Sequence, residues 1–294
     1  MESKTIQGYL QKKTILVTGA TGFLAMGTLI FGKNTKGSTR CEKGLSLLRA
    51  PDINSARDRM HNEIIGKELF KVLREKMGAY FDSFISEKVV AIPGDFTSDL
   101  YYDLVIFFFT CKYDIALDVN TFGVLHVLSF AKKCLKLEML LHVSTAYVCG
   151  ERAGLIAEDL SSSLIDDIIN NNFELHEKKL VEEKLNERKA QGASEEIITR
   201  TMKDLGIERA KLYGWPNTYV FTKAIGEIFL HHSKDNLPLV IIRPSVVTST
   251  YKEPFPGWTQ GLRTIDSIIA GYGKGKLKCL LVDPTSVFDM VSSK

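Results

Sequence analysis

A tyrosine and a lysine four residues apart could carry proton-transfer chemistry. Tyr219 and Lys223 stand at i and i+4, so a helix over this stretch places both side chains on one face. A nearby lysine cation favours the phenolate and lowers the tyrosine pKa toward a range useful for general acid catalysis. Earlier in the chain a predicted strand ends in the hydroxyl residue Thr145, with Ser144 as the alternative hydroxyl. The Tyr-x-x-x-Lys pattern is common by itself, so its significance depends on the elements that would position it.

A glycine turn near the start of the chain predicts a dinucleotide site. Apolar and β-branched residues at 14–17 predict a buried parallel strand before the turn. The pattern Gly-x-x-Gly-x-x-Ala follows at Gly19, Gly22 and Ala25. The first glycine permits a sharp strand-to-helix turn, the second lets a pyrophosphate approach the backbone, and the small third residue lets helix pack close to strand. The N–H groups at the start of the next helix would face the phosphates. The alternative is a structural turn in some other α/β protein.

The predicted cofactor contacts extend beyond these glycines. Arg49 follows a predicted strand, where a basic side chain suits the 2′-phosphate of NADP, although a solvated arginine at a strand end is an equal alternative. Asp95 follows the next predicted strand and could accept a hydrogen bond from an adenine amino group, or else cap the next helix. The cofactor-binding residues predicted in the turn are Gly19, Thr21, Gly22, Phe23 and Leu24.

The elements that must position these residues follow from the spacing of apolar side chains. Further strands are predicted at 45–48, 89–93, 139–144 and 239–242. Helices are predicted at 54–77, 118–133, 173–189, 194–206 and 219–232. Asn54 or Ser55 is expected to cap the first of these helices, and Gly206 is expected to end the fourth. The tail from Thr250 is rich in glycine and proline and is predicted to consist largely of turns.

The composition excludes several classes of protein. The chain has 294 residues, 45% hydrophobic and 25% charged, as is ordinary for a soluble protein with a core. Its formal net charge of +3 is too small to argue for nucleic-acid binding. The 5 cysteines lack disulfide or metal-ligand spacing, which predicts no metal site and a reducing compartment. Residues 1–13 lack the apolar segment of a signal peptide, and the apolar run Leu104–Phe109 is too short to span a bilayer.

Together these motifs resemble the extended branch of the short-chain dehydrogenase/reductase superfamily and, within it, plant fatty acyl-CoA reductases of the alcohol-forming type. The resemblance runs from about residue 13 to about residue 283 and is carried by the stretches 15–25, 141–150, 214–223, 240–245 and 253–258. In that family a tyrosine is the acid, a lysine also bonds the nicotinamide ribose, and a serine or threonine polarises the carbonyl. By resemblance these roles fall on Tyr219, Lys223 and Thr145, the last of which stands five residues before Gly150.

The resemblance implies both a fold and a function. The expected fold is α/β, a Rossmann-like, doubly wound, mostly parallel sheet with helices on both faces. One reductase domain is expected over 12–294, with a helical insertion at about 151–212 and without the family's C-terminal domain. The implied activity is NADPH-dependent reduction of a long-chain fatty acyl-CoA to a primary alcohol through an aldehyde, in lipid and wax metabolism. The implied place is the cytosol or the cytosolic face of the endoplasmic reticulum, with peripheral membrane association compatible with the sequence.

Three departures from the family pattern favour a catalytically impaired remnant as the alternative, which would at most bind acyl-CoA or a partner. Glycines punctuate Met26–Gly44, which does not match the family's first helix. Eight residues separate Asp95 from Leu104–Phe109, whereas a parallel crossover needs a dozen or more, and the family's Asn-x-Ala-Ala element is missing there. The third departure is the end of the chain at Lys294. A nucleotide-sugar epimerase or dehydratase of the same superfamily is a weaker alternative.

Overall fold

The computed structural model describes residues 9–10, 12–25, 41–94, 112–152, 154–158, 168, 172–252, 254–262, 264–283, 285 and 287–293. The chain divides into two compact units, the first made of residues 1–95 and 246–294 and the second of residues 96–245. Every strand pair within the described ranges is parallel, which agrees with the predicted class of α/β protein. The single domain over 12–294 stays a prediction.

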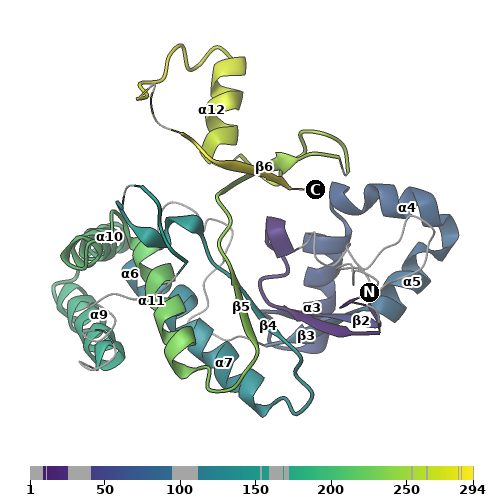
Figure 1. Ribbon diagram of the computed structural model, residues 1–294, viewed down its shortest axis with the longest axis horizontal. Helices are drawn as coiled ribbons and strands as arrows, with labels where there is room; N and C mark the ends of the chain where they lie inside the picture. Colours follow the sequence, from purple (N-terminus) through teal and green to yellow (C-terminus); the bar gives the residue numbers. More distant parts are fainter. Residues whose placement is uncertain are drawn as a thin grey trace. The chain divides into compact units, whose positions relative to one another are not determined.

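The first unit is built on a parallel sheet with the strand order β1-β2-β3 (Figure 1). Its strands are β1 (Thr14–Val17), β2 (Lys43–Leu48) and β3 (Val89–Pro93). Six helical segments connect β2 to β3: α3 (Ile53–Arg59), η1 (Met60–Ile65), η2 (Glu68–Phe70), α4 (Lys71–Met77), η3 (Gly78–Tyr80) and α5 (Phe81–Lys88). Side chains from these helices and from β2 and β3 form one hydrophobic core. The residues of β1 alternate between exposed and half-buried, so this strand is less buried than predicted.

The continuous helix predicted over 54–77 is wrong, because the chain breaks after its third turn. Asp52, rather than Asn54 or Ser55, caps α3: its Oδ1 accepts hydrogen bonds of 2.8 Å from both of their backbone N–H groups. The N–H of Gly66 donates to the carbonyl of His61 at 2.7 Å, an i to i−5 bond that widens the helix before it ends. Apolar residues on both sides of the break remain buried, so their spacing alone indicated one helix.

The tail of the first unit is more regular than its composition predicted. It contains β6 (Val246–Thr250), α12 (Thr264–Gly273) and β7 (Met290–Ser293). Residues after Thr250 therefore do not consist only of turns, and the prediction for this part was wrong in that respect. The reason is that β7 finds a parallel partner in β6, a pairing between distant segments that local glycine and proline content does not reveal.

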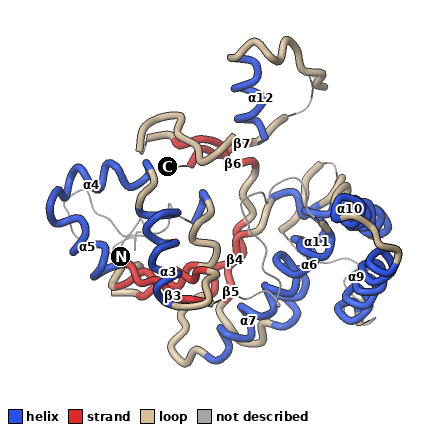
Figure 2. Tube along the Cα trace, turned by 180° about the vertical axis from the view of Figure 1, so that it is seen from behind, coloured by secondary structure: helices blue, strands red, loops and turns tan. Residues whose placement is uncertain are grey.

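The second unit packs helices around α11 (Thr218–Ser233), which confirms the helix predicted at 219–232 (Figure 2). Its strands β4 (Leu140–Val143) and β5 (Leu239–Ile242) pair in parallel. Its other helical segments are α6 (Tyr113–Leu117), η4 (Asp118–Phe122), α7 (Gly123–Lys133), η5 (Ala146–Cys149), α9 (Phe173–Ala190) and α10 (Glu195–Leu212). The helix α11 is buried on most of its circumference, so it is the core of this unit rather than a surface helix.

Two glycines allow helices to approach α11 closely. Gly206 does not end a helix, as predicted, but lies buried inside α10. A Cβ atom added there would lie 2.5 Å from Thr218 Oγ1 and 3.1 Å from Tyr113 Cβ. A Cβ atom added at Gly226 would overlap the carbonyl oxygen of Asn120. Both positions therefore require glycine for packing, although glycine disfavours the helix itself.

Among the described residues, one helical run, Tyr113–Lys133, is long and apolar enough to cross a membrane by length and composition. Buried polar contacts instead join its middle to α11. The amide of Asn120 donates to Thr222 Oγ1 at 3.0 Å, and the hydroxyl of Thr121 donates to the carbonyl of Thr222 at 3.0 Å. These contacts identify the run as a core helix of the second unit.

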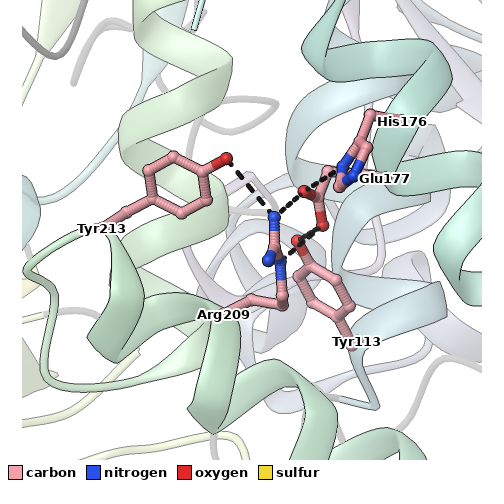
Figure 3. Close-up of polar contacts among 5 residues, drawn as sticks. All are labelled: Tyr113, His176, Glu177, Arg209 and Tyr213. Atoms are coloured by element: carbon pink, nitrogen blue, oxygen red, sulfur yellow. Dashed lines mark hydrogen bonds and ion pairs between the residues drawn. The ribbon is translucent and has the colours of Figure 1, made fainter. Parts of the chain in front are cut away.

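A buried ion pair anchors α9 and α10, which lie side by side, to α6 (Figures 1 and 3). Glu177 is fully buried and accepts hydrogen bonds from Tyr113 Oη at 2.6 Å and from Arg209 Nε at 3.1 Å, with a second bond from Arg209 Nη2. Arg209 also reaches Tyr213 Oη at 3.3 Å, and His176 Nδ1 lies 3.2 Å from the carboxylate. Burial and the carboxylate both raise the pKa of Tyr113, so its phenol remains a hydrogen-bond donor.

The Glu177→Gln variant should unfold more readily than the wild-type protein, because it leaves the Arg209 cation buried without its partner. The expected loss is about 3 kcal/mol in the free energy of unfolding. Urea denaturation, with hydrogen exchange resolved to α9 and α10, measures it. Tyr113→Phe is the matched control: it removes one hydrogen bond, leaves the ion pair intact and should cost about 1–2 kcal/mol. Equal stability of Glu177→Gln and wild type would contradict an anchoring role.

Candidate active site

The glycine turn of the first unit is a tight turn closed by a hydrogen bond. Gly19 follows β1 with φ of 62°, a left-handed conformation that favours glycine. The N–H of Gly22 donates to the carbonyl of Gly19 at 2.8 Å and closes the turn. A Cβ atom added at Gly22 would lie only 3.1 Å from that carbonyl oxygen. A side chain at this position would therefore crowd the carbonyl that closes the turn, which favours glycine there.

The side chains of this turn divide between the core and the surface. Phe23 is buried, and its ring centroid lies 5.6 Å from that of Trp258, so this predicted cofactor contact anchors the turn in the core. Leu24 is exposed and Thr21 half-buried. Trp258 lies in the stretch 253–258 that carries part of the family resemblance, and the sequence predicts no role for it, because only the fold brings it to Phe23. The residues present fit a cofactor held mainly by backbone groups.

The structure gives less information on the two other predicted cofactor contacts, Arg49 and Asp95. Arg49 directly follows β2 and is half-buried, and its carbonyl accepts a hydrogen bond of 2.6 Å from Arg59 Nη1. Asp95 lies outside the described residues, so its predicted contact with adenine stays a prediction. The runs 26–40 and 95–111, on which two departures from the family pattern fall, also lie outside them.

In the second unit, the start of α11 is fixed against the loop that carries Thr145. Asn217 caps the helix, and its Oδ1 accepts a hydrogen bond of 3.1 Å from the N–H of Val220. The indole N–H of Trp215 donates to the carbonyl of Val148 at 2.9 Å. Because Val148 belongs to η5, which begins one residue after Thr145, this bond ties the two segments together. Sequence reasoning missed Trp215, whose only signal was its place in the Gly-Trp-Pro-Asn run.

Lys223 reaches from α11 to the end of β4. Its Nζ donates to the carbonyl of Val143 at 3.2 Å, one residue before Ser144. Burial lowers the pKa of Lys223 to about 8, and the Glu227 carboxylate acts in the opposite direction. Burial and the same lysine lower the pKa of His142 to about 3, so this histidine is neutral at pH 7. Tyr219 is half-buried one turn before Lys223 on α11, so the structure brings the predicted acid, the lysine and the strand end into one unit.

The two candidate hydroxyls at the end of β4 differ in their bonding. Thr145 Oγ1 accepts a hydrogen bond of 3.4 Å from the N–H of Tyr147 and so caps η5. This use as an acceptor leaves the hydroxyl proton available for a substrate oxygen. Ser144 Oγ is buried and has no hydrogen-bond partner in the described part of the chain. The structure thus gives Thr145 a capping contact and leaves Ser144 Oγ without one, and the role of Thr145 in polarising a carbonyl stays a prediction.

A second polar pair near Lys223 was not predicted. Glu227, one turn further along α11, is fully buried and binds Arg243, which directly follows β5. The available signals were the spacing of Glu227 from Lys223 and the Arg-Pro-Ser run, but neither predicts a contact between them. Within the described ranges, no group of three or more His, Cys, Asp or Glu residues could hold a metal ion.

Comparison with protein families matches residues 17–100 and 107–293 to an NAD-binding family whose description is male sterility protein. The probable fatty acyl-CoA reductase 5 of Arabidopsis thaliana is 49% identical over 315 aligned residues, which cover 99% of this chain and 62% of that relative. The alcohol-forming fatty acyl-CoA reductase of Simmondsia chinensis is 47% identical over 312 residues, with the same two coverages of 99% and 62%. This chain thus spans less than two thirds of their length. Both alignments exceed its 294 residues, so these relatives carry residues that it lacks.

A solved structure supports the fold. The terminal R domain from the myxalamid PKS-NRPS biosynthetic pathway matches with a TM-score of 0.59 and 17% sequence identity, covering 96% of this chain and 59% of that chain. At this identity the likeness concerns the fold alone, and it supports the predicted Rossmann-like α/β class.

The Gly22→Val variant should lose NADPH binding, because its branched side chain would occupy the approach of the pyrophosphate and crowd the carbonyl of Gly19. Titration of NADPH fluorescence measures the affinity. Gly78→Val is the matched control, since Gly78 also lies in the first unit, at a helix end outside the turn, with φ of 53°. It should lose stability and keep wild-type affinity for NADPH. Wild-type affinity in Gly22→Val would reject the phosphate contact.

Proposed function

The chain belongs to the NAD-binding family described as male sterility protein, and from this premise we propose that it is an NADPH-dependent reductase. Its proposed reaction converts a long-chain fatty acyl-CoA to a primary alcohol through an aldehyde. The observation that carries the proposal is the hydrogen bond from Lys223 to the end of β4, which brings the Tyr219 helix to the strand end that precedes Thr145. The names of the plant relatives supply the acyl-CoA substrate class.

The residues of α11 and β4 would handle charge and protons. The nicotinamide cofactor, when bound, supplies hydride. Tyr219 would donate its phenolic proton to the oxygen on which negative charge develops, and Thr145 would donate a hydrogen bond to the same oxygen. Lys223, held by Val143, would favour the phenolate that Tyr219 becomes and bond the ribose. Loss of CoA as a thiol leaves an aldehyde, and a second reduction with the same residues gives the alcohol.

The cofactor and the compartment are part of the same proposal. NADPH is preferred over NADH because Arg49 follows β2, where a basic side chain suits a 2′-phosphate. The described cysteines, Cys41, Cys134, Cys149 and Cys279, are free thiols, which supports an intracellular reducing compartment. A long-chain acyl-CoA also suits the cytosol or the cytosolic face of the endoplasmic reticulum.

The second candidate function is an impaired remnant of the same family. It is favoured by the interruption of the family match between residues 100 and 107, together with alignments longer than the chain. A remnant that cannot close its cofactor site would show neither NADPH binding nor alcohol formation. An intact reductase would bind NADPH and turn over in the ordinary range of enzymes, on the order of 1 s⁻¹ or more.

The Tyr219→Phe variant tests the assignment of the acid. It should lower kcat for acyl-CoA reduction by roughly 10²–10⁴-fold, because only the transferable proton is lost. Its affinity for NADPH should remain close to that of the wild type. The assay follows alcohol formation from a C16–C18 acyl-CoA series by mass spectrometry. Turnover near the wild-type value would remove Tyr219 from the mechanism.

A pair of alanine variants distinguishes the two hydroxyls. Thr145→Ala should lower kcat by about 10²-fold or more, since a donor to the developing oxyanion is lost. Thr145→Ser should restore most of that activity. Ser144→Ala should leave kcat near the wild-type value, because in this proposal Thr145 supplies the hydrogen bond to the oxyanion. The opposite ranking of these activities would assign the role to Ser144.

A further inference from the structure

The ion pair between Glu227 and Arg243 has the geometry of a fixed charge pair rather than a flexible surface contact. Arg243 Nε lies 3.2 Å from Oε1 and 3.1 Å from Oε2 of Glu227, and Arg243 Nη2 lies 2.6 Å from Oε2. Glu227 is fully buried, and the arginine side chain is about one quarter exposed, at 23%. The hydrogen bond to Glu227 raises the pKa of Arg243, so the guanidinium stays charged. A buried carboxylate held in this way is locked in one position.

This pair and Lys223 join α11 to two neighbouring strands. Lys223 donates to Val143 at the end of β4, and Glu227, one helical turn later, binds the residue that follows β5. The strands are in register there, since Val143 pairs with Ile242 and the N–H of Ser144 donates to the carbonyl of Ile242 at 2.8 Å. The two contacts fix the position of α11 along its length against the segment that carries Thr145.

The charged groups around Lys223 come from three segments. Tyr219 and Glu227 lie on α11, one turn before and one turn after Lys223. His142 lies on β4, and Arg243 follows β5 and acts through Glu227. His142 is neutral at pH 7, so Glu227 is the negative charge that faces the lysine. Arg243 compensates part of that charge. Burial and the Glu227 carboxylate act on the pKa of Lys223 in opposite directions, and Arg243 can act on it only through Glu227.

We infer that Glu227 and Arg243 are positioning residues of the proposed reductase site, holding Lys223 as a cation beside the end of β4 through their geometry and their opposed charges. The inference rests on the proposed function for its catalytic meaning. A merely structural pair would support the fold and have no defined effect on the lysine. A positioning pair changes the pH at which Lys223 loses its proton, and the direction of that change depends on whether the negative or the positive charge of the pair is removed.

The experiment measures the protonation of Lys223 in the full chain without cofactor. The wild-type protein and its variants are labelled with a limiting amount of acetic anhydride over a pH series, and mass spectrometry quantifies acetylation of the peptide containing Lys223. The expected wild-type midpoint lies near pH 8. Glu227→Gln should move the midpoint down by about one pH unit, because the ammonium loses its negative neighbour. Arg243→Gln should move it up, because the carboxylate is no longer compensated.

The double variant and a matched control complete the test. The double variant, Glu227→Gln with Arg243→Gln, removes both charges, and its midpoint should return toward the wild-type value. If Arg243→Gln alone does not fold, comparison of the double variant with Glu227→Gln still measures the effect of the guanidinium. Glu177→Gln removes an equally buried carboxylate from an arginine pair in the same unit. In the described part of the chain, the polar partners of Glu177 are Tyr113, His176 and Arg209 rather than Lys223 or Arg243. It should lose stability without moving the Lys223 midpoint.

Two results would overturn the inference. One is a displacement of the Lys223 midpoint in the same direction by both single variants, and the other is a midpoint that Glu227→Gln leaves unchanged. Labelling needs neither bound cofactor nor turnover, so it succeeds or fails independently of the proposed reductase activity. If the chain is inactive but the Lys223 midpoint moves as expected in both variants, the proposed function is refuted and the inferred effect of Glu227 and Arg243 on Lys223 is retained.

Discussion

The burial of α11 is the constraint on which the second unit depends. Its glycine, Gly226, lies directly against the carbonyl oxygen of Asn120, and Gly206 brings α10 against its first residue, Thr218. A helix packed this closely cannot rotate or slide without opening the core. Its polar side chains therefore face fixed partners, Val143 for Lys223 and Arg243 for Glu227. The same packing that stabilises the unit sets the geometry of the proposed chemistry.

Two buried carboxylates in this unit show how similar contacts can serve different purposes. Glu177 joins helices on the side of α9 and α10, where the hydrogen bonds of Tyr113 and Arg209 satisfy it. Glu227 stands one turn from Lys223, so its charge acts on a titrating group as well as on the packing. A buried ion pair does not by itself make the fold more stable than apolar residues of similar volume at the same positions would. The location of Glu227 beside the proposed site, rather than its energy, gives it a distinct role.

The sequence predicted elements well where a single local signal controlled them. Strands such as β3 and helices such as α9 and α11 follow from apolar runs and helical spacing. The break at Gly66 was not predicted, because the apolar spacing continues across it. The passage of α10 through Gly206 was not predicted, because the contacts of Gly206 with Thr218 and Tyr113 exist only in the fold. The pairing of β6 with β7 lies beyond local reasoning for the same reason.

The candidate site shows the same division. The Gly-x-x-Gly turn and the Tyr-x-x-x-Lys spacing are local patterns, so they could be read directly. Trp215 with Val148 and Glu227 with Arg243 join residues that are distant in sequence, and no periodicity predicts such pairs. Phe23 was assigned to the cofactor from its place in the turn, whereas its contact with Trp258 puts its side chain in the core.

The fate of the transferred hydrogen tests the central claim most directly. The purified chain is incubated with palmitoyl-CoA and NADPH carrying transferable deuterium at nicotinamide C4, and the lipid products are analysed by mass spectrometry. We predict a primary alcohol with two deuterium atoms at C1, one from each reduction. An aldehyde as the final product, an alcohol without deuterium, or no reduced product from folded protein would contradict it.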